Sequence, residues 1–185
     1  MNETEVLLLK ASFLSVICLF ALAACAQVPS GNVYVGYSYL RADLPGGDTN
    51  LNGWNGSVEV KVLPLLGLVG DFSGNYGSQT ITSAFFLPVN ASVAQHNFLF
   101  GPRLSFSLGK FRPFIHGLIG ASHISESATG ISNSDTSLAD ALGGGIDYHL
   151  IPAISWRLQI DALQTRFFSG TQNDTRVSTG IVVHF

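Results

Sequence analysis

Charged side chains of both signs recur at alternate positions in segments that otherwise contain apolar and small polar residues. Arg157 and Asp161 lie four residues apart with Gln159 between them, so an extended strand would place all three on one face. The charges in comparable segments are nearly balanced in sign: Glu59, Asp71 and Asp147 against Lys61, Arg103 and Arg176. Because an unpaired charge in a confined interior is costly, these residues predict an internal network of ion pairs.

The histidines are the other side chains that could do chemistry: His96, His116, His123, His149 and His184. A metal site needs several ligands to converge, and the spacing of these histidines gives no indication that they do, so we expect no metal and no cofactor. His96 and His123 have Ser125, Glu126 and Asp135 nearby in sequence, which are residue types that hydrolases combine. No recognisable motif joins them, so we expect no catalytic residues and no enzymatic activity.

The composition restricts the class of protein. Hydrophobic residues make up 46% of the 185 residues and charged residues only 11%, whereas ordinary soluble domains carry roughly 25% charged residues. A transmembrane helix needs about 20 consecutive apolar residues, and the chain after residue 26 contains no such run. The formal charge of −3 and the absence of a basic cluster argue against a nucleic-acid partner.

Apolar and polar residues alternate along most of the chain, which predicts β-strands whose two faces meet different surroundings. In the last segment Val177, Thr179, Ile181, Val183 and Phe185 form one face. Arg176, Ser178, Gly180 and His184 form the other, with Val182 as an apolar exception. About eight segments show the pattern: residues 32–40, 53–63, 66–76, 93–108, 112–125, 138–149, 154–167 and 175–185.

The predicted connections alternate between short and long. Short links fall at residues 63–65, 109–111 and 149–152, and longer polar ones at residues 41–52, 77–92, 126–137 and 169–174. This alternation predicts an all-β, eight-stranded antiparallel up-and-down transmembrane β-barrel with both termini and the short turns at one end. The apolar face carries large aromatic groups suited to lipid, such as Trp54, Phe98 and Trp156. A soluble lipocalin-like ligand-binding barrel, with its apolar face inside, is the alternative.

The first residues predict a secretion leader that is removed. Residues 1–26 contain an apolar core from Phe13 to Ala23 followed by Ala24-Cys25-Ala26, which resembles a signal-peptidase site. The barrel domain would then span residues 27–185. Leu22 to Cys25 also fits the lipobox of bacterial lipoproteins, so lipidation of Cys25 is the other possibility. Both cysteines lie in this leader, and after ordinary cleavage no disulfide or cysteine–metal site remains.

Residues 31–185 as a whole resemble the OmpA-type outer-membrane β-barrel family. Four stretches carry the resemblance: Val35-Gly-Tyr-Ser-Tyr39, Arg112-Pro-Phe-Ile-His-Gly-Leu-Ile-Gly120, Gly143-Gly-Gly-Ile-Asp-Tyr148 and Ser178-Thr-Gly-Ile-Val-Val-His-Phe185. The last one looks like the assembly signal of outer-membrane barrels, with Ile181, Val183 and Phe185 on its apolar face. Larger relatives append a peptidoglycan-binding domain, and this sequence stops at Phe185, so the resemblance implies no anchoring to the cell wall.

The resemblance implies a monomer in the bacterial outer membrane, solvated by membrane lipid and lipopolysaccharide and inserted by the barrel-assembly machinery. A structural, surface or weakly conducting porin-like role is expected. The network of Glu59, Lys61, Asp71, Arg103, Arg157, Asp161 and Arg176 would lie in the lumen, either as a gate for small solutes or as a plug of paired charges. A membrane-embedded enzyme acting on lipid A is the alternative function. The polar loops are expected to be solvated surface segments.

Overall fold

The computed structural model describes residues 30–44, 47–82, 88–128, 131–167 and 170–185. The predicted leader and Cys25 lie outside these residues. Gly31–Phe185 forms one compact unit. In the part of the chain that is described, no helix is long and apolar enough to cross a membrane.

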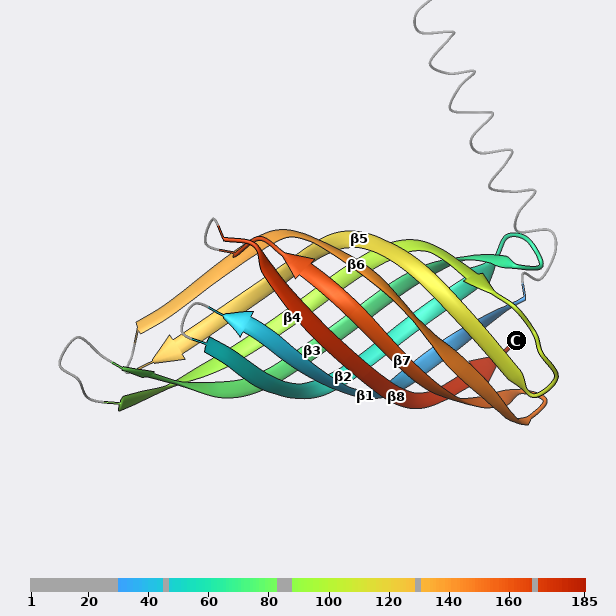
Figure 1. Cartoon of the computed structure of the whole chain (residues 1–185), viewed down its shortest axis with the longest axis horizontal. Coiled ribbons are helices and arrows are strands. Elements are labelled where there is room, and N and C mark those ends of the chain that lie inside the picture. Colours follow the sequence, from blue (N-terminus) through green and yellow to red (C-terminus); the bar gives the residue numbers. More distant parts are fainter. Residues whose placement is uncertain (1–29, 45–46, 83–87, 129–130, 168–169) are drawn as a thin grey trace, which may run out of the picture. The chain divides into compact units, whose positions relative to one another are not determined.

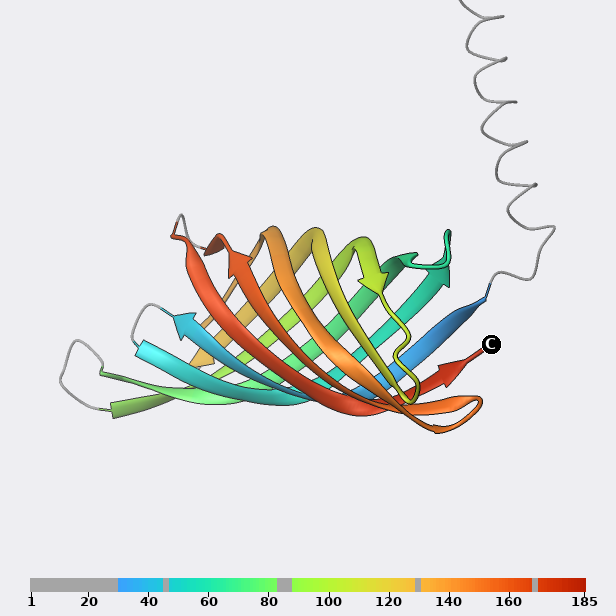
Figure 2. The same cartoon turned by 45° about the vertical axis from the view of Figure 1, so that its right-hand side comes forward.

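Eight antiparallel strands close into a barrel in which each strand pairs with its neighbour in sequence (Figure 1). This arrangement confirms the predicted fold class. The strands are β1 (Gly31–Leu44), β2 (Gly47–Lys61), β3 (Leu66–Thr82), β4 (Pro88–Ser105), β5 (Phe111–Ala128), β6 (Ile131–Ile151), β7 (Ile154–Thr165) and β8 (Gln172–His184). All of them are tilted steeply against the long axis of the barrel (Figure 2).

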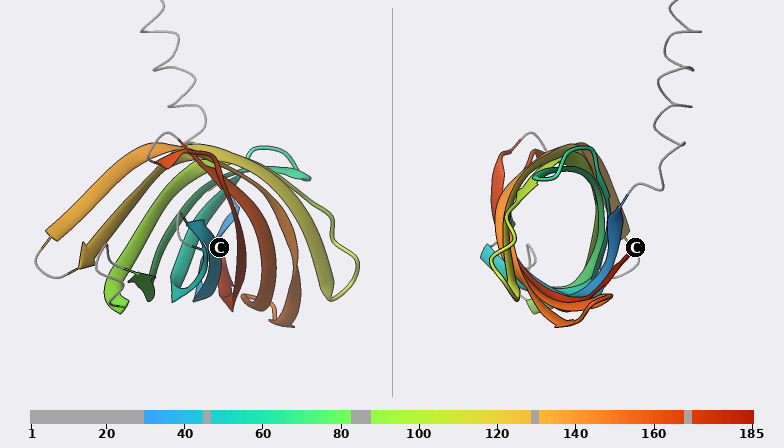
Figure 3. Two further views of the ribbon diagram at one scale, coloured as in Figure 1. Left: turned by 60° about the vertical axis from the view of Figure 1, so that its left-hand side comes forward. Right: turned by 90° about the vertical axis from the view of Figure 1, so that its right-hand side faces the viewer.

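The barrel closes where the first and last strands meet. β1 pairs with β8 from Asn32↔His184 to Arg41↔Thr175. Beyond that register, the Gly31 amide donates to the Phe185 carbonyl at 2.9 Å, and the Phe185 amide donates to the Gly31 carbonyl at 3.0 Å. A view along the barrel shows the resulting ring of strands, with β1 beside β8 (Figure 3). The sheet therefore has no free edge, which is the condition for spanning a membrane with strands.

The alternation of the sequence sets which face is inside. In β7 the side chains of Trp156, Leu158 and Ile160 are exposed on the outside, whereas Arg157, Gln159 and Asp161 are fully buried in the lumen. This polarity is the reverse of a lipocalin, whose interior is apolar and whose surface is polar. The outward apolar face needs lipid as its solvent, so the soluble alternative does not fit the structure.

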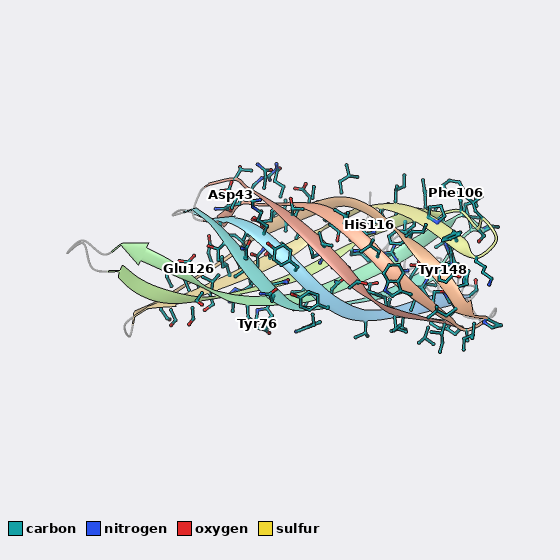
Figure 4. All side chains as sticks on the ribbon, turned by 60° about the horizontal axis from the view of Figure 1, so that its bottom comes forward. Asp43, Tyr76, Phe106, His116, Glu126 and Tyr148 are labelled. Carbon is teal, nitrogen blue, oxygen red and sulfur yellow. The ribbon has the colours of Figure 1, made fainter. Side chains whose placement is uncertain are left out.

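Exposed aromatic side chains mark both borders of the outer apolar belt. At the end with the chain termini they are Phe106, Phe111, Trp156 and Phe185, and toward the other end they are Tyr37, Trp54, Phe72, Tyr76 and Phe98. Phe100 lies between the two groups on β4. Figure 4 shows Phe106 and Tyr148 at one end of the barrel, and Asp43 and Glu126 at the other. Aromatic groups at both borders are typical of a barrel whose rims lie at the two membrane interfaces.

The prediction of long loops was wrong, because the strands continue through most of those residues. β1 and β2 pair as far as Leu44↔Gly47, within the predicted 41–52 loop. β5 and β6 likewise pair as far as Ala128↔Ile131, within the predicted 126–137 loop. Backbone hydrogen bonds continue along a ladder whether the side chains are polar or apolar, so loss of the apolar pattern did not mark the strand ends. The polar segments are therefore hairpin extensions that project beyond the apolar belt.

Six buried apolar side chains fill the lumen at the end away from the chain termini. This inner apolar cluster consists of Leu40, Ala42, Leu51, Val93, Ile124 and Phe167. The polar lumen predicted from the sequence is thus correct for the charged network but wrong for this end. It is also wrong for a second buried apolar cluster beside the network, formed by Val69, Leu99, Leu118, Ala139, Ala141 and Leu163. Ala42 and Leu51 fell in a predicted loop and were not assigned a face, which hid the inner apolar cluster.

Candidate functional site

The candidate site is the network of charged side chains inside the barrel. The structure places Glu59, Lys61, Asp71, Arg103, Arg157, Asp161 and Arg176 on inward-facing positions of β2, β3, β4, β7 and β8. Alternation along each strand positions them, because every second residue must face the lumen. An eight-stranded barrel is narrow, so side chains from opposite walls meet.

Arg176 lies at the centre of this network. Its guanidinium donates to Asp71 Oδ1 at 2.8 Å and to Asp161 Oδ2 at 2.9 and 2.7 Å. A further bond joins Arg176 Nη1 to Ser73 Oγ at 3.0 Å. The side chains of Arg176, Asp71 and Asp161 have no solvent exposure. Arg176 therefore links β8 to β3 across the lumen, and a single cation balances two buried carboxylates.

His116 extends the network from Asp161 to Arg103. Its Nε2 lies 2.8 Å from Asp161 Oδ1, and its Nδ1 lies 3.3 and 3.1 Å from Arg103 Nε and Nη2. A guanidinium can only donate hydrogen bonds, so Nδ1 of His116 must accept and Nε2 must carry the proton that goes to Asp161. His116 therefore bridges a carboxylate and a guanidinium through its two ring nitrogens.

Glu59 forms ion pairs with several cationic side chains at the end of the lumen where the chain termini lie. Lys61 Nζ is 2.7 Å from Glu59 Oε1, Arg103 Nη1 is 3.4 Å from Oε2, and Arg112 Nη2 is 3.8 Å from Oε1. Asn32 also donates to Glu59 Oε2 at 2.8 Å. The carboxylate is almost completely buried, and Lys61 and Arg112 are slightly exposed. This end of the lumen is therefore rich in positive charge.

A separate ion pair joins Arg157 to Asp147 inside the lumen. Arg157 donates to both oxygens of Asp147, from Nε at 2.6 Å and from Nη2 at 2.8 Å. The guanidiniums of Arg103 and Arg157 both lie over the ring of Phe114, at 4.3 and 4.7 Å from its centroid. Charge pairing and cation–π contact together compensate much of the cost of burying these two cations.

Glycines on neighbouring strands leave room for the carboxylates of this network. A Cβ built on Gly143 would lie 2.0 Å from Asp161 Oδ1, and one on Gly67 would lie 2.5 Å from Glu59 Oε1. Both carboxylates therefore sit against bare backbone of the neighbouring strand. In the glycine-rich stretch at residues 143–145, Gly143 thus makes room for the Asp161 side chain, in addition to any effect of the glycines on the bending of the strand.

Sequence reasoning missed two members of the network, His116 and Arg112. Both lie on β5, where Phe114 and Leu118 share the inward face with them and Ile115 and Ile119 face outward. With apolar residues on both faces, alternation gave no assignment for this strand. Pairing could have resolved it, because Arg112 and His116 lie opposite Asp147 and Gly143 in the register of β5 and β6.

The remaining histidines make hydrogen bonds with hydroxyl groups. On the outer face, His96 Nε2 lies 3.0 Å from Tyr76 Oη, and His123 Nδ1 lies 2.7 Å from Thr136 Oγ1. At the end of the lumen with the termini, Ser155 Oγ is 2.8 Å from both His149 Nδ1 and His184 Nε2. Among the described residues, no group of three or more metal-ligating side chains could hold a metal ion.

The residues considered for hydrolysis do not lie on one face. His96 and His123 are cross-strand partners on the outside of β4 and β5. Asp135 is the partner of Ile124, whose side chain is buried inside, and Glu126 has the same parity as Ile124. Strand alternation therefore directs the two carboxylates to the lumen side and the two histidines to the outer side.

Comparison with known proteins agrees with this architecture. Residues 12–185 match the family model described as "Outer membrane protein beta-barrel domain". No curated protein matches the sequence. Among solved structures, Ail of Yersinia pestis is 16% identical with a TM-score of 0.62, and the match covers 86% of this chain and 100% of Ail.

Two further solved barrels have the same fold at low sequence identity. Neisserial surface protein A is 12% identical with a TM-score of 0.68, over 84% of this chain and 97% of that protein. The N-terminal β-barrel domain of Pseudomonas aeruginosa OprF is 12% identical with a TM-score of 0.55, over 84% and 99% of the two chains. With the family match and the closed eight-stranded barrel, the chain belongs to the outer membrane protein β-barrel domain family and is a protein of the bacterial outer membrane.

Proposed function

We propose that this protein is a structural, surface-presenting barrel whose lumen is closed to solutes, and that it catalyses no reaction. The observation that carries the proposal is the set of bonds that cross the lumen between strands that are not neighbours. Arg176 on β8 reaches Asp71 on β3, His116 on β5 reaches Asp161 on β7, and Arg103 on β4 reaches Glu59 on β2. All six side chains are almost completely buried.

The inner apolar cluster supports a closed lumen for a separate reason. Leu40, Leu51 and Phe167 are completely or almost completely buried above the charged network, on the side away from the termini. A constriction lined by apolar groups excludes water and hydrated ions even where it is not fully blocked. A solute would have to disrupt both the ion pairs and this cluster.

The proposal also includes how the barrel is inserted into the membrane and which molecules surround it there. Lipid and lipopolysaccharide would solvate the outer apolar belt, and the barrel-assembly machinery would read the C-terminal strand through Ile181, Val183 and Phe185. These three side chains are exposed on the outside of β8. The barrel closes on itself, so a monomer suffices. The hairpin extensions beyond the belt would form the surface that the protein presents.

A weakly conducting role is the second candidate, because part of the lumen is polar and incompletely bonded. Tyr34 Oη, Ser57 Oγ, Gln159 Oε1 and Ser178 Oγ are buried and have no hydrogen-bond partner among the described residues. Further atoms of this kind, Asn75 Oδ1 on β3 and Gln95 Oε1 on β4, extend the set around most of the lumen. Buried polar atoms of this kind bind water, so the polar part of the lumen is where ions would pass if any do.

Single-channel recording in planar bilayers distinguishes the two roles. We expect no stable conductance steps from the folded wild-type protein, because both barriers are in place. Leu51→Ser, which makes the inner apolar cluster polar, should produce brief small-ion openings. Val60→Ser, an outward change on the same strand, is the matched control and should stay silent. Stable open channels from most wild-type insertions would overturn the closed-lumen proposal in favour of the porin-like one.

A further inference from the structure

Positive charge exceeds negative charge at the end of the lumen near the chain termini, which we call the periplasmic mouth. Lys61, Arg103 and Arg112 all lie within 4.0 Å of one carboxylate, Glu59. Asp147, the cross-strand partner of Arg112, already takes a two-point bond from Arg157. The mouth therefore holds four cations against two carboxylates, Lys61, Arg103, Arg112 and Arg157 against Glu59 and Asp147, and has a net charge of +2.

Lys61 and Arg112 both donate hydrogen bonds to one uncharged oxygen, the hydroxyl of Ser105. Lys61 Nζ donates to Ser105 Oγ at 2.6 Å, and Arg112 donates to the same oxygen from Nε at 3.3 Å and from Nη2 at 3.0 Å. Lys61 is also paired with Glu59 Oε1 at 2.7 Å, whereas the contact of Arg112 with the same oxygen is longer, at 3.8 Å. Two cationic groups thus converge on one hydroxyl, although N–H donors of this kind bond more strongly to an anionic oxygen.

These two side chains are also the accessible part of the network. Lys61 and Arg112 retain 11% and 15% of their side-chain exposure, whereas Arg103 retains none. Each is the terminal inward-facing cation of its strand, on β2 and β5. Lys61 and Arg112 are therefore the members of the network that a ligand at the periplasmic mouth would contact first.

We propose that Lys61, Arg112 and Ser105 form a binding site for a phosphate-type oxyanion at the periplasmic mouth. The Arg112 guanidinium supplies two parallel donors that match two oxygens of a phosphate, and Lys61 adds a compact charge. The Ser105 proton is free to donate to a third oxygen, because the Ser105 oxygen accepts bonds from the two cations. The bound group would offset the local charge of +2, either as inorganic phosphate or as the phosphate of a lipid headgroup.

Isothermal titration of the folded protein in an uncharged detergent with inorganic phosphate tests the site. Retention of phosphatidylglycerol from mixed micelles, measured by native mass spectrometry, forms a second arm. We expect phosphate binding that weakens by roughly tenfold or more in Arg112→Gln and Lys61→Gln, since each loses a charged hydrogen bond. Binding in the first arm identifies a free anion, and retention in the second arm alone identifies a lipid headgroup.

Lys110→Gln is the matched control, because it removes the same charge from the adjacent turn, where Lys110 is exposed. Arg112→Lys keeps the charge but loses the two parallel donors, so it should weaken binding less than Arg112→Gln does without restoring the wild-type affinity. A heat-dependent gel shift establishes that every variant is folded. The proposal is overturned if the wild type binds neither ligand. It is equally overturned if Lys110→Gln weakens binding as much as Arg112→Gln does.

Discussion

Gly143 determines how closely Asp161 can approach its partners. A Cβ at this position would lie 2.0 Å from Asp161 Oδ1 and 2.7 Å from the Ile160 carbonyl. Gly143→Ala should therefore push Asp161 away from His116 and Arg176, leaving charged groups buried with poorer partners. We expect a loss of roughly 1–3 kcal/mol in the free energy of unfolding, measured by urea titration in detergent micelles.

Gly117 provides the control for this substitution, because a Cβ there meets nothing within 4 Å. Gly117→Ala should leave the unfolding free energy unchanged within about 0.5 kcal/mol. Equal destabilisation by the two changes would mean that the effect of alanine at position 143 does not arise from Asp161.

At this scale the sequence predicted which face each charge occupies but not which charges pair. Arg176 and Asp71 are separated by 105 residues, and nothing in either segment specifies their contact. The pairing depends on the lumen diameter and on the stagger between strands, which arise only when the barrel closes. His116 was missed for a related reason, because its strand carries apolar residues on both faces.

At the scale of single elements, β8 combines two roles, closing the ring and carrying the predicted assembly signal. Phe185→Ala keeps the backbone bonds with Gly31, so the finished ladder should be unaffected. We expect less folded protein in the outer membrane because the terminal aromatic group is lost to the assembly machinery. The measurement is the heat-modifiable band in the outer-membrane fraction.

Phe106→Ala tests whether any exposed aromatic residue at this end would have the same effect. Phe106 and Phe185 are 47% and 56% exposed, so both changes remove a similar contact with lipid. Phe106→Ala should assemble normally. If Phe185→Ala accumulates folded protein at the wild-type level, the assignment of Phe185 to the assembly signal is wrong.

The element boundaries show where sequence patterns stop being informative. The short turns at residues 63–65 and 109–111 were predicted close to their observed positions, because Pro64 and Gly109 interrupt the apolar pattern directly. The predicted link at residues 149–152 was too long, because residues 149–151 belong to β6 and only Pro152 and Ala153 connect it to β7. The far ends of the strands were not, since pairing there continues through polar residues such as Ser125↔Ser134 and Asn50↔Arg41. Alternation of polarity reports the membrane boundary, and the hydrogen-bonded sheet extends beyond it.

For the whole molecule, Arg176 connects walls of the barrel that are far apart in sequence. Arg176→Met would leave Asp71 and Asp161 buried without their shared cation. We expect the free energy of unfolding in micelles to fall by about 3–5 kcal/mol, as when one partner of a buried ion pair is removed.

The exposed Arg166 provides the comparison for this prediction. Arg166→Met removes the same charge outside the network and should change stability by less than about 0.5 kcal/mol. A loss below about 1 kcal/mol for Arg176→Met would show that the lumen hydrates readily enough to solvate the two carboxylates, which would also weaken the case for a closed lumen.

The paired backbone of Gly31 and Phe185 makes the hydrogen-bonded ladder continuous around the barrel. In a continuous ladder every strand has two paired neighbours. A circular permutation that joined Phe185 to Gly31 and opened the chain at another turn would leave every inter-strand hydrogen bond in place. Which strand of this cyclic order comes first in the chain therefore adds little to the stability of the finished barrel. That order matters during biogenesis, where it decides which strand arrives last and is left to close the ring.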